Sequence, residues 1–202
     1  MADSYTLSKE ISMNYMTPFS RRLEFTTGKF DKTDLVQTRR LSDLKGLFAD
    51  QEAEAALMQE NPVLYEVFLA FDAPPEHGQL GYSTTVIYPG KVGDEYFMTK
   101  GHYHSKGECA ELYTCLQGEG YLLMQTREGE VKAIHMTPGV AAYVPPYWGH
   151  STMNVGKENF VFYACYPAEA GYDYGTIAEK GFASIIVERN GRAEVVANPT
   201  YK

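Results

Sequence analysis

Short apolar runs separated by turn residues are the feature that most constrains this fold. From Pro62 onward, runs of β-branched and aromatic residues alternate with Gly, Pro, Asn and Asp. Strand-like runs recur at roughly 8 to 12 residues, a spacing typical of sandwiches and barrels. Sixteen Tyr and eighteen Gly suit this pattern, because aromatic side chains pack on pleated sheets and Gly suits turns. The sequence therefore predicts an all-β protein, either a β-sandwich or a jelly-roll barrel.

The turn residues also predict where the strands lie. We expect strands over residues 63–71, 82–88, 95–100, 112–116, 121–125, 131–136, 140–144, 160–166, 182–188 and 193–196. Asn190-Gly191 is a strong signal for a tight hairpin turn between the last two of these strands.

The N-terminal part has a different character. Residues 1–40 are polar and mixed, with isolated apolar residues that indicate short strands. Asp50 is a good helix N-cap, residues 51–60 are rich in Ala, Glu, Leu and Met, and Pro62 forces an end near Asn61. We expect one domain of 202 residues, in which 1–61 hold N-terminal strands and the only sizeable helix, and 62–202 form the barrel.

Composition excludes several classes of function. The net charge of −8 argues against a nucleic-acid partner, which requires a basic face. No apolar run approaches the length of a membrane span, and no basic segment precedes an apolar stretch at the N-terminus. Three Cys without CxxC spacing are expected to be reduced thiols. These features predict a cytoplasmic protein that contacts neither membrane nor nucleic acid.

A group of metal-ligand residues gives the strongest functional signal. His102 and His104 fall on one face of a strand, because strand side chains alternate in direction. Glu111 follows closely, and His150 lies in a second distinctive segment. Three imidazoles and a carboxylate suit a divalent first-row metal such as Fe, Mn, Ni or Zn. His77 and His135 are expected to be structural instead.

These residues fall in two motifs that resemble those of the cupin superfamily. The first motif has a His-x-His, a Glu, six residues and a Gly, matched by His102, His104, Glu111 and Gly118. The second motif is matched by Gly139, Pro145, His150 and Asn154. The resemblance implies a cupin jelly-roll β-barrel with a short N-terminal helical segment.

Longer blocks are similar to one family within this superfamily, the cupin-type phosphoglucose isomerases. The similar segments are residues 40–43, 62–67, 88–93, 98–104, 143–148 and 166–182. The last segment is highly specific, since generic cupin architecture does not require it. The likeness covers about residues 40 to 202.

The resemblance implies a metal-dependent interconversion of glucose 6-phosphate and fructose 6-phosphate, in glycolysis or gluconeogenesis. One divalent metal ion per subunit would be held by His102, His104, Glu111 and His150, with iron as the first candidate and Mn, Ni or Zn as alternatives. The metal would act as a Lewis acid toward the sugar oxygens and stabilise a cis-enediolate. Glu111 would carry the proton as base and acid, with Tyr166 beside the reacting carbons. A hydride shift remains the alternative mechanism.

The resemblance also implies the substrate contacts and the oligomer. Tyr113 would line the sugar site, and the phosphate would be bound by Tyr65, Thr85, Thr99, the Gly101 backbone N–H and Tyr174. Hydroxyls and main-chain amides can hold a phosphate without a buried cation. A homodimer is expected, formed by sheet extension through the N-terminal strands.

Two other functions are compatible with the same ligand set. A cupin dioxygenase or oxalate-degrading enzyme would consume oxygen or release carbon dioxide, and would not need the phosphate-site Tyr and Thr residues. A non-catalytic sugar-phosphate or metal sensor would bind its ligand tightly without turnover, and would usually carry a DNA-binding module.

Overall fold

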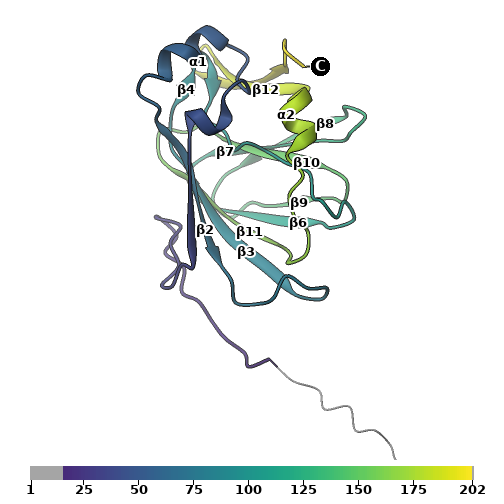
Figure 1. Ribbon diagram of the computed structural model, residues 1–202. Helices are drawn as coiled ribbons and strands as arrows, with labels where there is room; N and C mark the ends of the chain where they lie inside the picture. The colour runs from purple at the N-terminus through teal and green to yellow at the C-terminus, as the bar shows by residue number, and fades with distance from the viewer. Residues whose placement is uncertain (1–15, 202) are drawn as a thin grey trace, which may run out of the picture.

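A computed structural model describes residues 16–201, which form mainly antiparallel β-structure (Figure 1). The strands are β1 (Leu35–Arg40), β2 (Val63–Ala70), β3 (Leu80–Ile87), β4 (Lys91–Val92), β5 (Glu95–Tyr96), β6 (Glu111–Gln117), β7 (Gly120–Gln125), β8 (Val131–Met136), β9 (Ala141–Val144), β10 (Gly149–Asn154), β11 (Phe160–Pro167), β12 (Ser184–Arg189) and β13 (Arg192–Ala197). The helices are η1, a 3₁₀ helix (Leu41–Leu44), α1 (Gln51–Leu57) and α2 (Gly175–Lys180).

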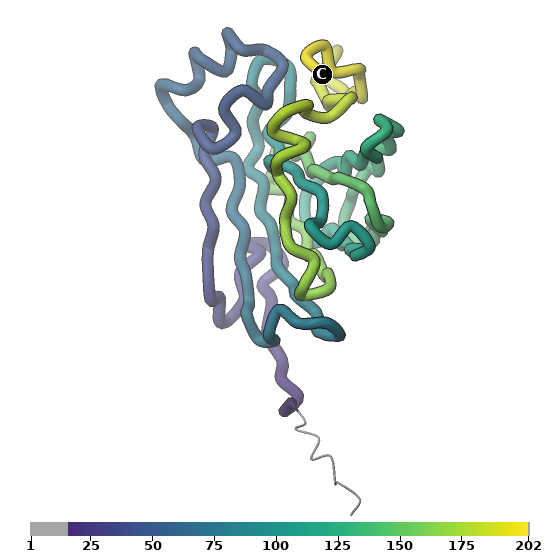
Figure 2. Tube along the Cα trace, turned by 45° about the vertical axis from the view of Figure 1, so that its right-hand side comes forward, coloured from purple at the N-terminus to yellow at the C-terminus, as the bar shows by residue number. Residues whose placement is uncertain are grey.

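The strands form three sheets. The largest has six strands in the order β1-β2-β3-β11-β6-β9, and a second sheet has the order β10-β7-β8. A smaller sheet has the order β13-β12-β5-β4, and β12 and β4 lie near α1 at one end of the molecule (Figure 1). Figure 2 shows the early strands β1, β2 and β3 side by side in one layer, and β7, β8 and β10 form a second layer. This arrangement of facing antiparallel sheets confirms the predicted all-β, cupin-like jelly-roll fold.

The hydrophobic core fills the space between the layers. Leu122 and Leu123 of β7 and Phe160 of β11 are fully buried within one large cluster. A second, smaller cluster lies on the outer face of the six-stranded sheet, where Phe30 packs with Phe68 and other apolar side chains. The six-stranded sheet thus has apolar clusters on both faces, and the part of its inner face that the core does not cover lines a pocket.

The inner face of this sheet has a regular register. Tyr65 lies across from Arg39 on one side and Ile87 on the other. One step along, Thr85 lies between Val67 and Phe162. Every second side chain of a strand points to the same face of the sheet. The register therefore places side chains of β1, β2, β3 and β11 on the inner face, where they surround one interior space.

The helical segment agrees in part with its prediction. Asp50 is the N-cap of α1, and its Oδ1 accepts a hydrogen bond from the Ala53 backbone N–H at 2.9 Å. The helix ends at Leu57, before the expected boundary, and the residues up to Glu60 form turns. A second short helix, α2, lies in a stretch where no helix was expected. No helix among residues 16–201 has the length and apolar character that a membrane span requires.

The strand predictions hold with several differences. β4 and β10 were not predicted, and β1 was covered only by the general expectation of short N-terminal strands; β1 and β10 both carry residues that matter for the site. The predicted strand 95–100 is regular only over β5, and the segment with His102 and His104 makes isolated bridges rather than a regular strand. The partition into residues 1–61 and a barrel stays a prediction, and residues 1–15 lie outside the described part.

Candidate metal centre and adjoining pocket

The backbone brings His102 and His150 together directly. The two residues form an isolated antiparallel bridge, in which the His102 N–H donates to the His150 carbonyl at 3.1 Å and the His150 N–H donates to the His102 carbonyl at 2.9 Å. β10, which carries His150, is itself paired with β7. His102 is therefore attached to the edge of the second sheet, although its segment is not a regular strand.

Four potential ligand atoms converge at this bridge. One atom each from His102, His104, Glu111 and His150 lies within 4.8 Å of all the others. Glu111 Oε2 is 3.1 Å from His104 Nε2 and 3.0 Å from His150 Nε2. Ligands around one metal ion stand about 3 to 3.5 Å apart when metal–ligand bonds are about 2.1 Å. The four residues predicted as ligands are thus together, and the two contacts of Glu111 have spacings that suit ligands of one ion.

Two buried nitrogens add to this fit. His102 Nε2 is buried and has no hydrogen-bond partner among the described residues, a costly state for a polar atom. His150 Nε2 also lacks hydrogen-bond geometry, although it is 3.0 Å from Glu111. Both atoms could be satisfied by binding a cation at the centre of the cluster.

The Nδ1 atoms of His104 and His150 contact backbone carbonyl groups on the side of each ring away from the cluster. His104 Nδ1 is 2.9 Å from the Cys109 carbonyl, and His150 Nδ1 is 3.3 Å from the Trp148 carbonyl. A backbone carbonyl accepts from an N–H, so each contact favours the tautomer that leaves Nε2 unprotonated. Histidine ligands of metals are usually oriented by contacts of this kind.

The electrostatics of the cluster keep one carboxylate ionised among neutral or cationic rings. Burial lowers the pKa of His102 well below its ordinary value, and the charge of His150 lowers it further. Burial acts to raise the pKa of Glu111, but the hydrogen bond with His104, the close contact with His150 and the charge of the histidines overcome this and lower the pKa to about 2. Burial opposes protonation of His104, but its contact with Glu111 prevails and raises its pKa. Glu111 is therefore an anion at neutral pH.

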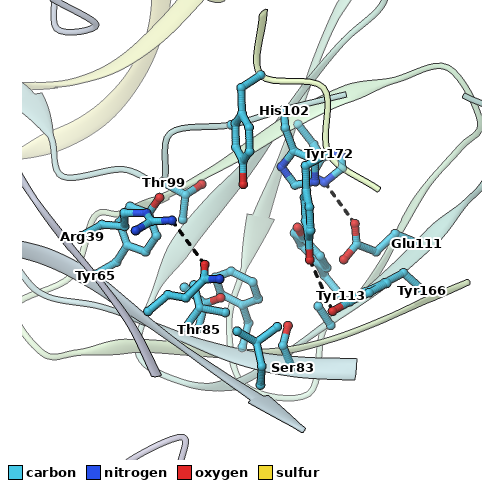
Figure 3. A pocket seen from close by; sticks show the side chains of 18 residues that line it. Arg39, Tyr65, Ser83, Thr85, Thr99, His102, Glu111, Tyr113, Tyr166 and Tyr172 are labelled. Atoms are coloured by element: carbon cyan, nitrogen blue, oxygen red, sulfur yellow. Dashed lines mark hydrogen bonds and ion pairs between the residues drawn. The ribbon is translucent and has the colours of Figure 1, made fainter. Parts of the chain in front are cut away.

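A pocket opens beside this cluster over the inner face of the six-stranded sheet (Figure 3). His102, Glu111 and His150 form part of its wall. Every predicted substrate residue and the predicted catalytic tyrosine line the same pocket: Tyr65, Thr85, Thr99, Gly101, Tyr113, Tyr166 and Tyr174. His104 instead faces a second, more apolar cavity, which also reaches Glu111 and Tyr166.

One end of the pocket is rich in hydroxyl groups. Tyr65 Oη accepts a hydrogen bond from the Lys100 backbone N–H at 3.3 Å, and burial raises the pKa of Tyr65 to about 12. Thr99 Oγ1 lies 3.2 Å from Ser151 Oγ and accepts from the Thr152 backbone N–H at 3.0 Å. The hydroxyls are thus protonated and fixed in position.

Gly101 lies beside this group because no larger residue fits. Its φ is +73°, and a Cβ there would lie 2.6 Å from Phe182 Cε2 and 3.0 Å from Ser151 Cβ. Both the backbone conformation and the space favour glycine at this position.

The other end of the pocket holds two tyrosines beside the carboxylate. Tyr172 Oη and Tyr166 Oη are 3.5 Å apart. The Tyr172 ring packs edge-on against His102 at 4.8 Å between centroids and stacks on Tyr174 at 5.9 Å. Burial raises the pKa of Tyr166 and of Tyr172, so both carry their phenolic protons at neutral pH.

Several pocket residues were not identified as site residues from the sequence. They are Gln37, Arg39, Ser83 and Tyr172, together with apolar wall residues. The alternation of Gln37 and Arg39 in β1 could have indicated that both face one side of a strand. The sequence held no comparable local signal for Ser83 or Tyr172.

Comparisons with known proteins relate the whole chain to one family. The family model for glucose-6-phosphate isomerase (GPI) matches residues 38–202. The glucose-6-phosphate isomerase of Thermococcus litoralis is 52% identical over 94% of this chain and 100% of its own, and that of Pyrococcus furiosus is 51% identical over 93% and 99%. The oxalate decarboxylase of Lactobacillus farciminis aligns with 55% of this chain and 30% of its own at a TM-score of 0.44 and 18% identity. Because the family model and the relatives span nearly all of the sequence, this chain belongs to the glucose-6-phosphate isomerase family.

Proposed function

We propose that this protein is a metal-dependent isomerase that interconverts glucose 6-phosphate and fructose 6-phosphate. One observation carries the proposal: the four ligand atoms of His102, His104, Glu111 and His150 meet within 4.8 Å at the wall of a hydroxyl-lined pocket. Membership of the isomerase family supports the reaction, and the ligand cluster supports the metal.

The metal would be held by the three histidines and Glu111. When bound, a divalent ion supplies Lewis-acid chemistry that polarises the neighbouring O1 and O2 atoms of the open-chain sugar. Nitrogen-rich sites of this kind accept Fe, Mn, Ni or Zn, and we propose iron as the first candidate.

Glu111 is suited to move the proton between C1 and C2. Its carboxylate is ionised at neutral pH, so it can take the C2 proton of glucose 6-phosphate. The C–H electrons form the C1=C2 double bond of a cis-enediol while the C1=O1 π electrons move onto O1, which is protonated. O2 then gives up its proton, so that a proton passes in net from O2 to O1, and the C2=O2 carbonyl forms as Glu111 returns its proton to C1. Tyr166 carries its phenolic proton beside this carboxylate and would donate a hydrogen bond to the reacting oxygens.

The remaining pocket residues would orient the substrate. Tyr113 is buried against the His150 ring, with 5.6 Å between ring centroids, and would pack against the sugar chain. The phosphate would lie among Tyr65, Thr85, Thr99, the Gly101 backbone N–H and Tyr174. This placement sets C1 and C2 beside Glu111 and the phosphate at the opposite end.

We also propose that the protein is a homodimer. β1 is an edge strand of the six-stranded sheet, and its side chains Leu35 and Val36 are exposed. An exposed strand edge with apolar side chains can pair with a second copy. Light scattering on the purified protein tests this: a mass of one chain would refute the dimer.

A coupled assay tests the isomerase. Metal-stripped protein is reconstituted separately with Fe, Mn, Ni and Zn, given fructose 6-phosphate and followed for glucose 6-phosphate. His104→Ala and Glu111→Ala are expected to abolish turnover. His135→Ala is the matched control, because His135 is exposed and pairs with Glu119 away from the cluster.

The alternatives have distinct outcomes. A metal-loaded, folded protein that turns over no sugar phosphate but consumes oxygen or releases carbon dioxide from oxalate would be an oxidase or decarboxylase. Sugar-phosphate binding without turnover would indicate a non-catalytic binding protein.

Isotope exchange tests the proton path. Isomerisation in D₂O is expected to place deuterium at C1 of fructose 6-phosphate, because a proton held on Glu111 can exchange with solvent. A product free of deuterium, under conditions where Glu111 is required, would support a hydride shift from C2 to C1 instead.

A further inference from the structure

We infer that Arg39, on the edge strand β1, binds the phosphate of the substrate and makes the pocket selective for a dianionic sugar phosphate. This inference rests on the proposed function, because it assigns a specificity residue to the same pocket. The inference is based on the position of Arg39. This arginine has no acidic partner among the described residues and lies at the hydroxyl-rich end of the pocket, away from Glu111 (Figure 3).

The strand geometry aims Arg39 inward. Gln37 and Arg39 alternate with exposed neighbours along β1, and both line the pocket. Arg39 is the register partner of Tyr65, and Gln37 is the partner of Val67, which in turn pairs with Thr85. The Arg39 side chain therefore lies on the same face of the sheet as Tyr65 and Thr85, in adjacent strands.

A register shift separates Arg39 from the next arginine. The pairing of β1 with β2 is irregular between Arg39 and Arg40. Arg40 is exposed, and its Nη1 donates to the Asn61 carbonyl at 3.0 Å, outside the pocket. Irregularities of this kind re-aim side chains at sheet edges. Arg39 and Arg40 thus have different surroundings, and only Arg39 lies where it can bind a ligand in the pocket.

Most N–H donors of the Arg39 guanidinium form no hydrogen bond to another side chain among the described residues. Arg39 Nη2 lies 3.4 Å from Gln37 Oε1, a long hydrogen bond to a neutral amide. Within the described residues 16–201, no carboxylate forms an ion pair with Arg39. The one carboxylate in the pocket wall is Glu111, which is engaged by His104 and His150. The pocket consequently has a cationic end and an anionic, metal-binding end.

This polarity matches a hexose 6-phosphate. Its anionic group is at C6, and its reacting carbons C1 and C2 are at the opposite end of the open chain. Arginine presents a planar fork of N–H donors that matches two phosphate oxygens. The chain as a whole carries a net charge of −8, and a local cation in the pocket would counter the repulsion that this field exerts on a dianion. A guanidinium adds a fixed positive charge that neutral hydroxyls do not supply, and this charge favours the dianion over the monoanion.

The test compares two neighbouring arginines. Arg39→Gln, Arg39→Lys and the matched control Arg40→Gln are assayed with fructose 6-phosphate across pH 5.5 to 8, where phosphate monoesters pass from monoanion to dianion, their second pKa being about 6. Arg39→Gln is expected to raise KM about 10- to 100-fold, the effect of losing a hydrogen bond to a charged group, with kcat changed less than threefold. In the wild type, KM is expected to fall as the pH rises, because the substrate becomes a dianion. In Arg39→Gln, this dependence of KM on pH should be lost. Arg39→Lys should recover part of the affinity.

A binding measurement separates this inference from the isomerase assignment. Inorganic phosphate is titrated calorimetrically into the metal-loaded wild type, Arg39→Gln and Arg40→Gln, and its inhibition constant is measured where turnover exists. Weaker phosphate binding in Arg39→Gln alone supports the inference, whether or not the wild type isomerises the sugar. Equal phosphate affinity and KM in Arg39→Gln and Arg40→Gln, or no phosphate binding by the wild type, overturns it. A wild type that binds phosphate through Arg39 but has no isomerase activity refutes only the proposed function.

Discussion

His102 and His150 exchange two backbone hydrogen bonds, and their rings lie 4.5 Å apart between centroids. This pairing joins the two halves of the candidate metal centre, since one histidine precedes β6 and the other lies on β10. The position of the centre therefore depends on backbone pairing as well as on the identity of the ligands.

Gly149 is the residue that permits this pairing. A Cβ at position 149 would lie 2.6 Å from Tyr103 Cζ, which is closer than side chains pack. We expect Gly149→Ala to displace His150 and to weaken metal binding at least tenfold, measured by competition with a chelator. Gly156→Ala is the control, because a Cβ there meets its neighbours at 3.5 Å, an ordinary contact. Equal metal affinity in the two variants would contradict the prediction.

Gly81 has a similar relation to Tyr166. The two residues are register partners on β3 and β11, and a Cβ at position 81 would lie 2.5 Å from Tyr166 Cε2. Gly81→Ala should move the Tyr166 ring and lower kcat about 10- to 100-fold, because small displacements of catalytic groups are costly. Steady-state kinetics at saturating metal measure the effect, with thermal melting as the check on folding. A variant with unchanged kcat would show that the position of the ring is not critical.

Metal binding should also stabilise the fold. The four ligands come from segments on both sheets, so an ion bound at the cluster favours the folded state over the unfolded chain. A metal concentration 100 times the Kd is expected to add about 2.7 kcal/mol to the free energy of unfolding. Calorimetric melting with and without metal measures this gain. His104→Ala should lose most of it and His135→Ala should retain it; equal gains in both would place the metal elsewhere.

Glu95 should make stability depend on pH. It is buried in β5, burial raises its pKa to about 7, and the Ala49 backbone N–H donates to its Oε2 at 2.9 Å. Below the ordinary value of 4.5, Glu95 is protonated in both the folded and unfolded states, so the folded state carries no penalty. Between pH 4.5 and about 7, the unfolded chain releases this proton while the folded chain still holds it, so the free energy of unfolding falls. The loss is complete once the pH is above about 7.

Replacing this carboxyl group should remove that loss. Glu95→Gln keeps an oxygen for the Ala49 N–H and is expected to be more stable than the wild type by about 1 to 3 kcal/mol at pH 8, with little difference at pH 4.5. Urea unfolding at the two pH values measures the difference. Glu194→Gln, at an exposed position of β13, is the control and should change neither. A difference independent of pH would rule out titration of Glu95 as the cause.

Much of this protein could be predicted from local patterns in the sequence. The turn residues located most of the strands, and Asp50 with its following residues located the start of α1, because caps and turns depend on a few neighbouring residues. His102 and His104 were predicted as metal ligands from their spacing together with Glu111 and the segment around His150, and the structure brings these four residues together. Alternation places the side chains of His102 and His104 on one side of an extended chain even where the strand is irregular, as here.

The tertiary structure decided which of these segments meet. β1 has no strong strand signal of its own, yet its pairing with β2 places Arg39 beside Tyr65 in the pocket. Tyr172 lies in an irregular stretch and reaches His102 only through the return of the chain after β11. Alternation and turn chemistry act over a few residues, whereas strand pairing joins residues far apart in the chain. The sequence by itself therefore determined the candidate ligands and the class of fold, and the pairing of distant strands decided the shape and charge of the pocket around them.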